Sequence, residues 1–288
     1  MIVFSRKTAA VIYSVVILMM IYGTFYDAPV SAALYNAENP YGIFIAGFAH
    51  VPCMFLGAGC IGLFLRAYSH AGRNQKILLR LLTAMCSIGC AAVFALIFLN
   101  VPWRYSCIPA VLLAAAACLF AGFVRKSIPF DDPDRLIRTG VFLAAAAAAE
   151  IMLIWMIKIP WGRPRWRTVT AVGGLEFRPW YLPSLTLKTP YLRSGIGADE
   201  FMSFPSGHTG NASTALLTVV LGELIPSFRK NRNVILGAAS VWIVMVMLGR
   251  IVAGAHYVTD TAAGLCISYS AFLVLKLLYC RRFPDDFG

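Results

Sequence analysis

Long apolar runs constrain this chain more than any other feature. It has 288 residues, of which 59% are hydrophobic and only 13% are charged, whereas soluble domains carry about 25% charged residues. A helix that crosses a bilayer needs about 20 mostly apolar residues. We therefore predict an all-α fold, a polytopic membrane helix bundle with about eight transmembrane helices. The predicted spans are residues 8–25, 43–65, 81–100, 106–124, 140–157, 208–225, 234–252 and 259–279.

A few residues inside these runs need an explanation. The first run follows Arg6 and Lys7, as in a signal peptide, but no prompt cleavage pattern follows, so we interpret it as a retained signal anchor. Glu150 lies in the alanine-rich fifth run, where a carboxylate is costly. A hydrogen bond to a neighbouring helix explains it better than catalysis does. The eight cysteines form no zinc-like cluster, and we interpret them as packing residues.

The basic residues orient the bundle. Lys and Arg in short loops favour the cytoplasmic side of a membrane. With the N-terminus in the cytoplasm, most of the 25 basic residues fall on that side, and the short outer loop 26–42 has none. We therefore predict a multi-pass protein of the cytoplasmic membrane, with both termini cytoplasmic.

The net charge of +12 then has two parts. The cytoplasmic part is a topology signal that contacts anionic membrane lipids. The outer part lies mainly in segment 158–207. It either reflects a long translocated segment, which is partly exempt from the rule, or it binds an anion. Nucleic-acid binding is disfavoured because the chain has no basic soluble domain.

Three short stretches beside the spans carry the polar chemistry. They are Lys158 to Arg165 (KIPWGRPR), Pro205 to His208 (PSGH) and Arg250 to Asp260 (RIVAGAHYVTD). The eight-span topology places all of them on one outer face, so they can share a site. A seven-span topology would divide them between the two sides of the membrane.

In the third stretch, His256 and Asp260 are four residues apart. This spacing places them on one face of a helix, where the carboxylate can hydrogen-bond one imidazole nitrogen and leave the other to attack. A tight turn over residues 253–255 would return Arg250 to the side of His256. Taken alone, this pattern is weak evidence for catalysis.

The second stretch begins a span, so its backbone N–H groups form a natural anion site. Ser206 can cap the helix or donate to a phosphate, and Gly207 allows close approach of the backbone. His208 is placed to protonate a leaving oxygen. A capped helix with an interfacial histidine is the structural alternative.

The first stretch carries three cations, Lys158, Arg163 and Arg165. Such long side chains can extend to the membrane interface without binding any ligand. Alternatively, the guanidinium forks and the ammonium group bind phosphate oxygens. Three cations within eight residues, together with a histidine pair, favour phosphate binding.

Together, the stretches resemble the signature of the type 2 phosphatidic acid phosphatase superfamily, which includes vanadium haloperoxidases and glucose-6-phosphatase. Its pattern is Lys-x6-Arg-Pro, Pro-Ser-Gly-His and Ser-Arg-x5-His-x3-Asp. The resemblance covers roughly residues 140–280 and implies a six-helix phosphatase core. We divide the chain into residues 1–100, transmembrane helices outside the family core, and residues 101–288, a phosphatase core with an outer loop over 158–207. Trp166 and Gly249 depart from the pattern.

The resemblance also implies a mechanism. His256 attacks phosphorus to form a phosphohistidine, Asp260 orients it, and His208 protonates the leaving group and then activates water. The phosphoryl oxygens are held by Lys158, Arg165, Arg250, Ser206 and Gly207, with Arg163 as an accessory cation. The reaction needs no metal and no other cofactor.

We therefore expect an integral-membrane phosphatase that acts on a lipid phosphate or diphosphate at the extracytoplasmic face. Undecaprenyl diphosphate, phosphatidylglycerophosphate and phosphatidic acid all fit, and the outward topology slightly favours the polyprenyl diphosphate. A lipid phosphotransferase, or a non-enzymatic membrane protein with a degenerate site, is the alternative. The sequence leaves the oligomeric state open.

Two further features stay outside this site. Loop 167–204 is rich in aromatic residues, which either anchor it at the head-group level or form a lid over the substrate. His50 lies inside the second run and is interpreted as a hydrogen-bonded packing residue away from the site, and His70 as a solvated loop residue.

Overall fold

Helices make up the fold of this chain. The computed structural model describes residues 2–100, 103–129, 132–184 and 186–287, and no β-strand occurs among them. Seven segments within these residues are long and apolar enough to cross a bilayer. They comprise α1 (Arg6–Leu34), α2 and α3 (Pro40–Phe48 and Val51–Tyr68), α4 (Arg73–Asn100), α5 (Trp103–Ser127), α6 (Pro133–Trp161), α11 (Arg232–Val252) and α12 (Val258–Arg282).

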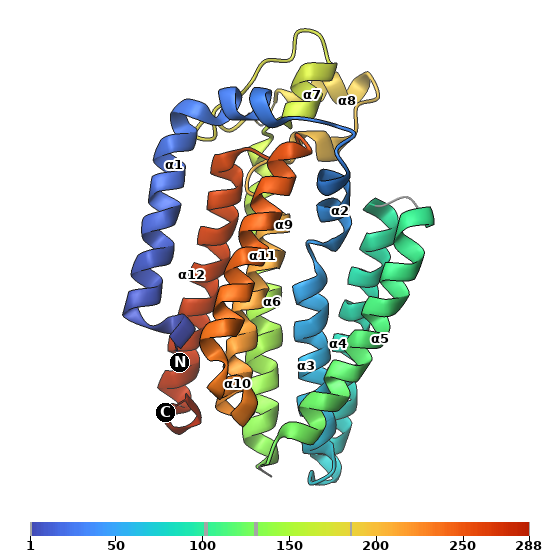
Figure 1. The fold of residues 1–288 in the computed structure, drawn as a ribbon, viewed down its shortest axis with the longest axis vertical. Helices are drawn as coiled ribbons and strands as arrows, with labels where there is room; N and C mark the ends of the chain where they lie inside the picture. Colours follow the sequence, from blue (N-terminus) through green and yellow to red (C-terminus); the bar gives the residue numbers. More distant parts are fainter. Residues whose placement is uncertain (1, 101–102, 130–131, 185, 288) are drawn as a thin grey trace.

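The eighth expected span, residues 208–225, is built differently. It begins as α9 (Gly207–Ser213) and continues as a 3₁₀ segment, η3 (Thr214–Glu223). In Figure 1 this part of the chain runs along the bundle towards α10 (Pro226–Lys230), and both termini lie towards that same end. Termini at one end require an even number of crossings. Among the described residues, the α9–η3 segment therefore adds one passage along the bundle to the seven segments that are long and apolar enough to span a membrane.

Helix α6 places the first stretch of the site. Asp132 caps its start through the N–H groups of Asp134 and Arg135, and Pro133 occupies the first helical position, where a missing N–H costs nothing. The helix ends at Gly162, whose φ of 71° is the left-handed conformation that glycine adopts at a helix C-terminus. Lys158 therefore lies in the last turn of α6, and Arg163 follows immediately after it.

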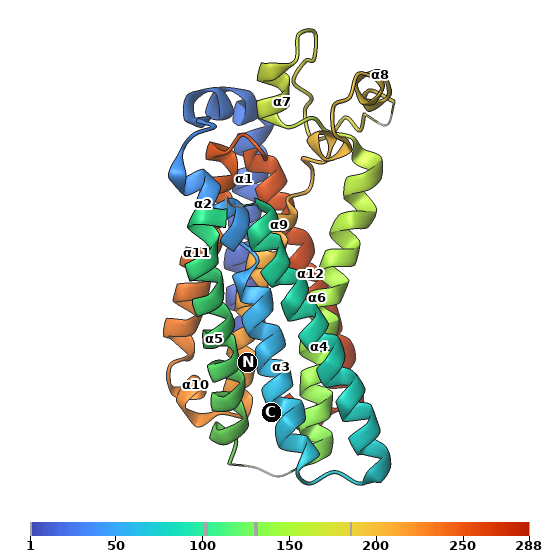
Figure 2. The same cartoon turned by 90° about the vertical axis from the view of Figure 1, so that its right-hand side faces the viewer.

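Two helices organise the packing of the bundle. Helix α3 packs against α4, α5 and α6, and helix α12 packs against α1, α6 and α9. Figure 2 shows α3 between α4 and α5, with α6 beside them. The outer surfaces carry large exposed apolar side chains such as Leu18, Phe25 and Leu119, which suits contact with lipid tails rather than water.

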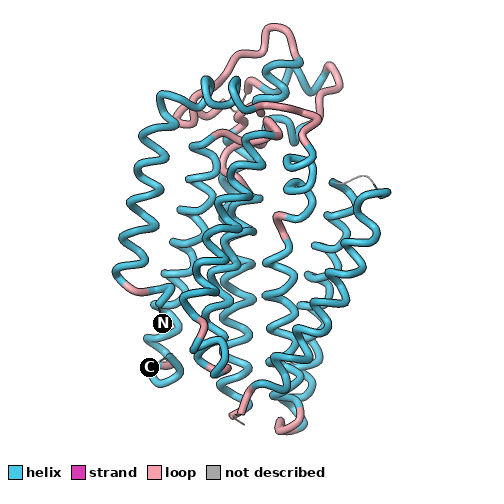
Figure 3. Tube along the Cα trace, in the orientation of Figure 1, coloured by secondary structure: helices cyan, strands magenta, loops and turns pink. Residues whose placement is uncertain are grey.

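Most of the irregular chain gathers at one end of the bundle (Figure 3). The expected outer loop contains two short helices, α7 (Trp166–Ala171) and α8 (Lys188–Arg193), and a 3₁₀ turn, η2 (Ala198–Phe201). The indole N–H of Trp180 donates to the hydroxyl of Thr24 in α1 over 2.9 Å, and the indole N–H of Trp161 donates to the Trp180 carbonyl over 2.8 Å. The loop is thereby tied to both α1 and α6.

Candidate active site

The three sequence stretches meet at the loop-rich end of the bundle, where backbone hydrogen bonds join them. The N–H of Ser203 donates to the Arg163 carbonyl over 3.0 Å, and the N–H of Ser206 donates to the Asp260 carbonyl over 2.9 Å. The second stretch is thus bonded directly to the third, and it is tied to the first through Ser203, which precedes it by two residues.

The turn between α11 and α12 has the form expected from the sequence. The Arg250 carbonyl accepts from the N–H groups of Ala255 and His256, at 3.1 and 3.2 Å. Gly254 has a φ of 61°, which a residue with a Cβ rarely adopts. The turn therefore returns the chain so that His256 lies beside the end of α11.

His256 is fully buried, and its tautomer follows from its contacts. Its Nδ1 lies 2.6 Å from the Ser203 carbonyl. A carbonyl only accepts, so Nδ1 carries the proton and Nε2 carries the lone pair. Nε2 has no hydrogen-bond partner among the described residues. The ring centre of His208 is 5.8 Å away.

Asp260 differs from the sequence-based expectation of a direct hydrogen bond to His256. Its Oδ2 lies 3.7 Å from His256 Nδ1, at ion-pair distance, while the Ser203 carbonyl takes the hydrogen bond. The carboxylate instead accepts from the Ser203 hydroxyl and from the Tyr257 N–H. Asp260 thus orients His256 indirectly, by holding Ser203 and the start of α12.

Burial is the main influence on the charge of His256. It lowers the pKa of His256 to about 3, and the nearby Asp260 carboxylate opposes this only in part. The positive charges of Lys158 and Arg250 also favour the neutral ring. The imidazole therefore remains neutral, with its Nε2 lone pair intact, over the whole physiological pH range.

Arg163 is buried in a charge network rather than placed in a pocket. It contacts Asp260 at 2.5 Å and Asp27 of α1 at 2.9 Å, and both carboxylates are almost fully buried. Its Nε donates to the Arg178 carbonyl, and its guanidinium carbon lies 4.0 Å from the centre of the Tyr257 ring. We predicted an accessory phosphate contact for Arg163, but its N–H groups are engaged with these protein partners.

The sequence reading missed Asp27. This residue accepts from both the N–H and the hydroxyl of Thr259, in addition to Arg163. A lone acidic residue inside an apolar run is a signal of function or of a buried partner. The predicted first span ends at residue 25, which leaves Asp27 in the predicted outer loop, whereas α1 continues to Leu34 and Asp27 is buried within it. Glu150 itself accepts a hydrogen bond from Ser268 of α12 at 3.2 Å, which matches its structural interpretation.

A pocket of about 400 Å³ opens beside His208, whereas His256 is not among the described residues that line it. Arg165, His208 and Arg250 line it, together with residues of the α1–α2 connection such as Tyr35 and Asn36. Arg165 Nε, His208 Nε2 and Arg250 Nε are buried and have no hydrogen-bond partner among the described residues. Buried polar atoms rarely stay unpaired, and two guanidinium groups beside an imidazole match the oxygens of an anion.

The remaining predicted residues are Lys158, Ser206 and Gly207. Lys158 donates to the Met202 carbonyl over 2.9 Å and is 7% exposed. Ser206 caps α9, with its hydroxyl accepting from the Thr209 N–H at 3.3 Å. A Cβ on Gly207 would meet only Ile154, at an ordinary 3.7 Å. The fold itself therefore does not require glycine at this position.

Close packing requires glycine instead at position 264 of α12, a residue that the sequence analysis did not identify. A Cβ there would press against the Ser206 carbonyl, well inside the 3.0 Å that real Cβ atoms respect. Glycine at this position lets α12 pass directly under the second stretch.

His50 is not where the sequence analysis placed it. The chain is interrupted between α2 and α3 at residues 49–50, and the imidazole of His50 lies with its ring centre 4.8 Å from that of His208. The expected hydrogen bond exists, with Asn211 Nδ2 at 2.7 Å from His50 Nδ1. The expectation that His50 is remote from the site is wrong.

Trp166 and Gly249 depart from the family pattern, and the contacts of each residue can be described. Trp166 occupies the first position of α7, where proline is well tolerated, and its ring meets Tyr257 edge-on at 6.4 Å. A Cβ on Gly249 would lie 2.7 Å from Ile45 of α2. Serine at this position would therefore collide with Ile45. Glycine lacks the serine side chain and so allows α2 to pack closely against α11.

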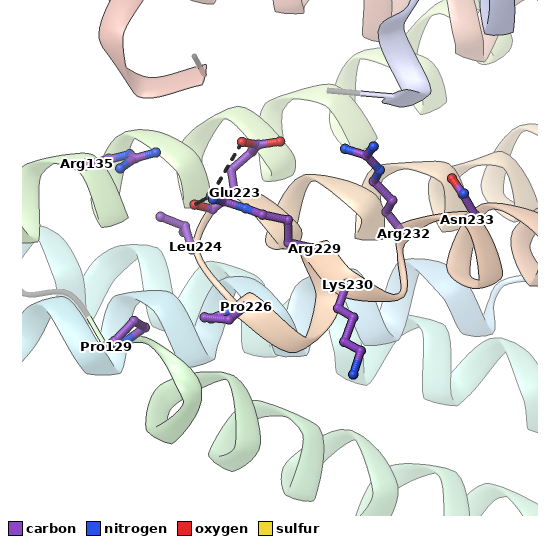
Figure 4. Close-up of a pocket in the computed structure, with 9 residues that line it drawn as sticks. All are labelled: Pro129, Arg135, Glu223, Leu224, Pro226, Arg229, Lys230, Arg232 and Asn233. Carbon is purple, nitrogen blue, oxygen red and sulfur yellow. Dashed lines mark hydrogen bonds and ion pairs between the residues drawn. The ribbon is translucent and has the colours of Figure 1, made fainter.

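A larger cavity of about 650 Å³ lies at the other end of the bundle (Figure 4). Arg135, Arg229, Lys230 and Arg232 line it, and Arg229 donates to the carbonyls of Gly222 and Glu223. It contains none of the residues of the three stretches. No group of three or more His, Cys, Asp or Glu side chains in the described part of the chain is arranged to hold a metal ion.

Comparison with known proteins agrees with this geometry. A family model described as the PAP2 superfamily matches residues 139–284, about half of the chain and all three stretches. Phosphatidylglycerophosphatase B of Bacillus subtilis (strain 168) is 32% identical over 80 residues, which cover 27% of this chain and 39% of that protein. No solved structure matches. The chain therefore belongs to the PAP2 superfamily.

Proposed function

We propose that the protein is a membrane phosphatase that hydrolyses a lipid phosphate or diphosphate. The observation that carries this proposal is a group of buried nitrogens of Arg165, His208 and Arg250 around one pocket, which have no hydrogen-bond partner in the part of the chain that the structure describes. Membership of the PAP2 superfamily and the similarity to a phosphatidylglycerophosphatase support it.

In the proposed first step, His256 Nε2 attacks phosphorus and the bond from phosphorus to the leaving oxygen breaks. His208 starts this step as the imidazolium and gives one proton to that oxygen, so a neutral His208, a phosphohistidine and a neutral alcohol, or a phosphate, result. The protonated Nδ1 stays bonded to the Ser203 carbonyl, 3.7 Å from Asp260. This nearby carboxylate stabilises the positive charge that the ring gains.

In the second step, His208 removes a proton from water, the water oxygen attacks phosphorus, and the phosphorus–nitrogen bond breaks. Arg165 and Arg250 bind the equatorial oxygens, and Lys158 adds positive charge from behind the site. The N–H groups of residues 207 and 208 at the start of α9 provide further donors. These interactions act where negative charge develops, which is the main source of catalysis in phosphoryl transfer.

The location of the site suggests a substrate in the membrane. The pocket lies at the loop-rich end of the bundle, and by the distribution of basic residues this end is extracytoplasmic. Phosphatidylglycerophosphate, phosphatidic acid and undecaprenyl diphosphate each present a phosphate group at this level. Among these three lipids, the outward topology slightly favours undecaprenyl diphosphate, the polyprenyl diphosphate.

The test is phosphate release by purified protein in detergent, from each of these three lipids and from glucose 6-phosphate, with and without a chelator. We expect lipid turnover that survives chelation and is lost in His256→Ala, while the unfolding temperature stays close to wild type. Wild-type turnover by His256→Ala would refute the mechanism. Loss of activity on chelation would refute metal independence.

A lipid phosphotransferase would use the same phosphohistidine with an alcohol in place of water. The pocket is open enough, at about 400 Å³, to admit a second head group. Phosphate release that requires an added alcohol acceptor would favour the transferase over the phosphatase.

A further inference from the structure

His50 is the feature near the site that the proposed reaction does not use. It precedes α3 at the break between α2 and α3, and it is 7% exposed. Its ring centre is 4.8 Å from that of His208, with 42° between the two planes. This separation is closer than the 5.8 Å between His208 and His256.

The contacts of Asn211 determine which nitrogen of His50 carries the proton. The thiol of Cys53 can donate to Asn211 Oδ1, at 3.6 Å, and to the Asn211 carbonyl, at 3.4 Å. With Oδ1 directed to this thiol, the amide nitrogen faces His50 Nδ1 at 2.7 Å and donates to it. The neutral His50 ring therefore accepts at Nδ1 and carries its proton on Nε2.

This arrangement holds the ring of His50 in one orientation. His50 immediately precedes α3 and Cys53 lies in its first turn, while Asn211 lies one turn after His208 in α9. Residues three or four apart on a helix share a face, so Asn211 and His208 present one surface to α3. The hydrogen bond from Asn211 therefore holds the His50 ring beside His208. The contacts of His50 and Cys53 with Asn211 also hold the turn of α9 that carries His208.

We propose that His50, held by Asn211, is a positioning residue for His208 that keeps this imidazole aligned with the leaving oxygen. The proposal rests on the proposed function, in which His208 is the proton donor. His50 lies outside residues 139–284, the part that matches the family. The segment before the matched region would thus contribute to the alignment of the general acid.

The test compares two phosphate esters that differ in their need for a general acid. Dioctanoyl phosphatidic acid has an alkoxide leaving group that must be protonated, whereas p-nitrophenyl phosphate has a leaving group that departs without a proton. General acid catalysis contributes about 10²–10⁴-fold. We expect His50→Ala to lower kcat for the lipid by at least about tenfold, and kcat for the aryl phosphate by less than about threefold.

Four further variants test the proposal more closely. His50→Phe keeps the ring but loses the acceptor for Asn211, and Asn211→Ala removes the same bond from the other side, so both should resemble His50→Ala. His70→Ala, an exposed histidine between α3 and α4, should behave as wild type. In a His208→Ala background, His50→Ala should cause no further loss on the lipid, because the residue it positions is gone.

An equal loss on both esters would show that His50 only maintains the fold, and would overturn the proposal, as would wild-type rates on both. An additive loss in the His208→Ala background would also overturn it. The proposed function fails by a different result, namely no lipid turnover by wild type, or lipid turnover by His208→Ala that equals wild type.

Discussion

The contact between Gly264 and Ser206 allows a sharp test of how the fold positions the site. Gly264 lies in the second turn of α12, directly against the carbonyl of the residue that caps α9. The Ser206 N–H is bonded to the Asp260 carbonyl at 2.9 Å. A Gly264→Ala substitution adds one methyl group at this contact and changes no charge.

The size of the effect follows from the geometry. The added Cβ would overlap the Ser206 carbonyl oxygen and lie 3.3 Å from both Ser206 C and Thr209 Cβ. To restore the roughly 3.5 Å at which non-bonded heavy atoms pack, the carbonyl must retreat by about 1 Å. Overpacking of this kind costs about 1–3 kcal/mol. A displacement of about 1 Å in a catalytic group can lower turnover about 10²-fold.

The assay measures kcat/KM for dioctanoyl phosphatidic acid and the unfolding temperature in the same detergent. Gly237→Ala is the matched control, because Gly237 lies inside α11 and no other element comes within 4 Å of the place that the added methyl group would take. Removing a glycine from a helix interior gains up to about 1 kcal/mol. The control should therefore keep full activity and equal or higher stability.

Two results would refute the reasoning. Wild-type kcat/KM and wild-type stability in Gly264→Ala would show that the contact is not tight. A lower unfolding temperature with unchanged kcat/KM, measured where the protein remains folded, would show that the contact stabilises the bundle but does not position the second stretch.

Three other predictions concern titratable residues in and around the site, namely Asp27, His256 and Glu200. Asp27→Asn breaks a buried ion pair and should cost about 3 kcal/mol of stability and lower kcat/KM, whereas Glu38→Gln on the exposed α1–α2 connection should change neither. The ordinary pKa of histidine is about 6.5 and that of His256 is lowered to about 3, so between these values only the unfolded state binds the proton. Stability should fall as the pH drops through this range, and His256→Gln should flatten that part of the curve. Burial alone would raise the pKa of Glu200, but hydrogen bonds from Arg167 and Thr168 hold it below its ordinary value. The contribution of Glu200 should therefore be complete above about pH 4.3 and decline below it, and Glu200→Gln should remove it at a cost under about 1 kcal/mol, since both partners are partly exposed.

Apolar length and residue spacing predicted much of this molecule. A bilayer permits few structures other than helices, so eight apolar runs were enough to indicate an all-α bundle. The three stretches taken together, including the spacing of Lys158 and Arg165 and of His256 and Asp260, led to the expectation of a phosphate site, which stays a prediction. The sixth crossing was less predictable, because hydropathy does not distinguish an α-helix from the 3₁₀ segment that follows Ser213.

What the sequence could not provide were contacts between residues far apart in the chain. His50 and His208 are separated by 158 positions, and only the packing of α3 against α9 brings their rings together. Asp27 and Arg163 meet in the same way, through α1. The preference for Ser203 over Asp260 as the partner of His256 Nδ1 depends on ångström-scale geometry, which no spacing rule contains.

The charge network of Arg163, Asp27 and Asp260 would also explain how the proposed phosphate site tolerates carboxylates. Asp27 and Asp260 would repel a phosphate, and burial would make each of them costly without a partner. Arg163 lies between them and pairs with both. Asp260 can then remain ionised within ion-pair distance of His256, and neither Asp260 nor Asp27 is among the described residues that line the pocket. Arg165 and Arg250 line the pocket itself, and the carboxylate within 4 Å of either of them among the described residues is the exposed Asp199, at 3.6 Å from Arg165. In the proposed reaction the two arginines of the first stretch have different tasks: Arg163 neutralises the carboxylates behind His256, and Arg165 lines the pocket beside Asp199, where it would contact the anion. An Arg163→Met variant separates these tasks, because it should impair folding and the alignment of His256, whereas Arg165→Met should raise KM in a protein of near-normal stability.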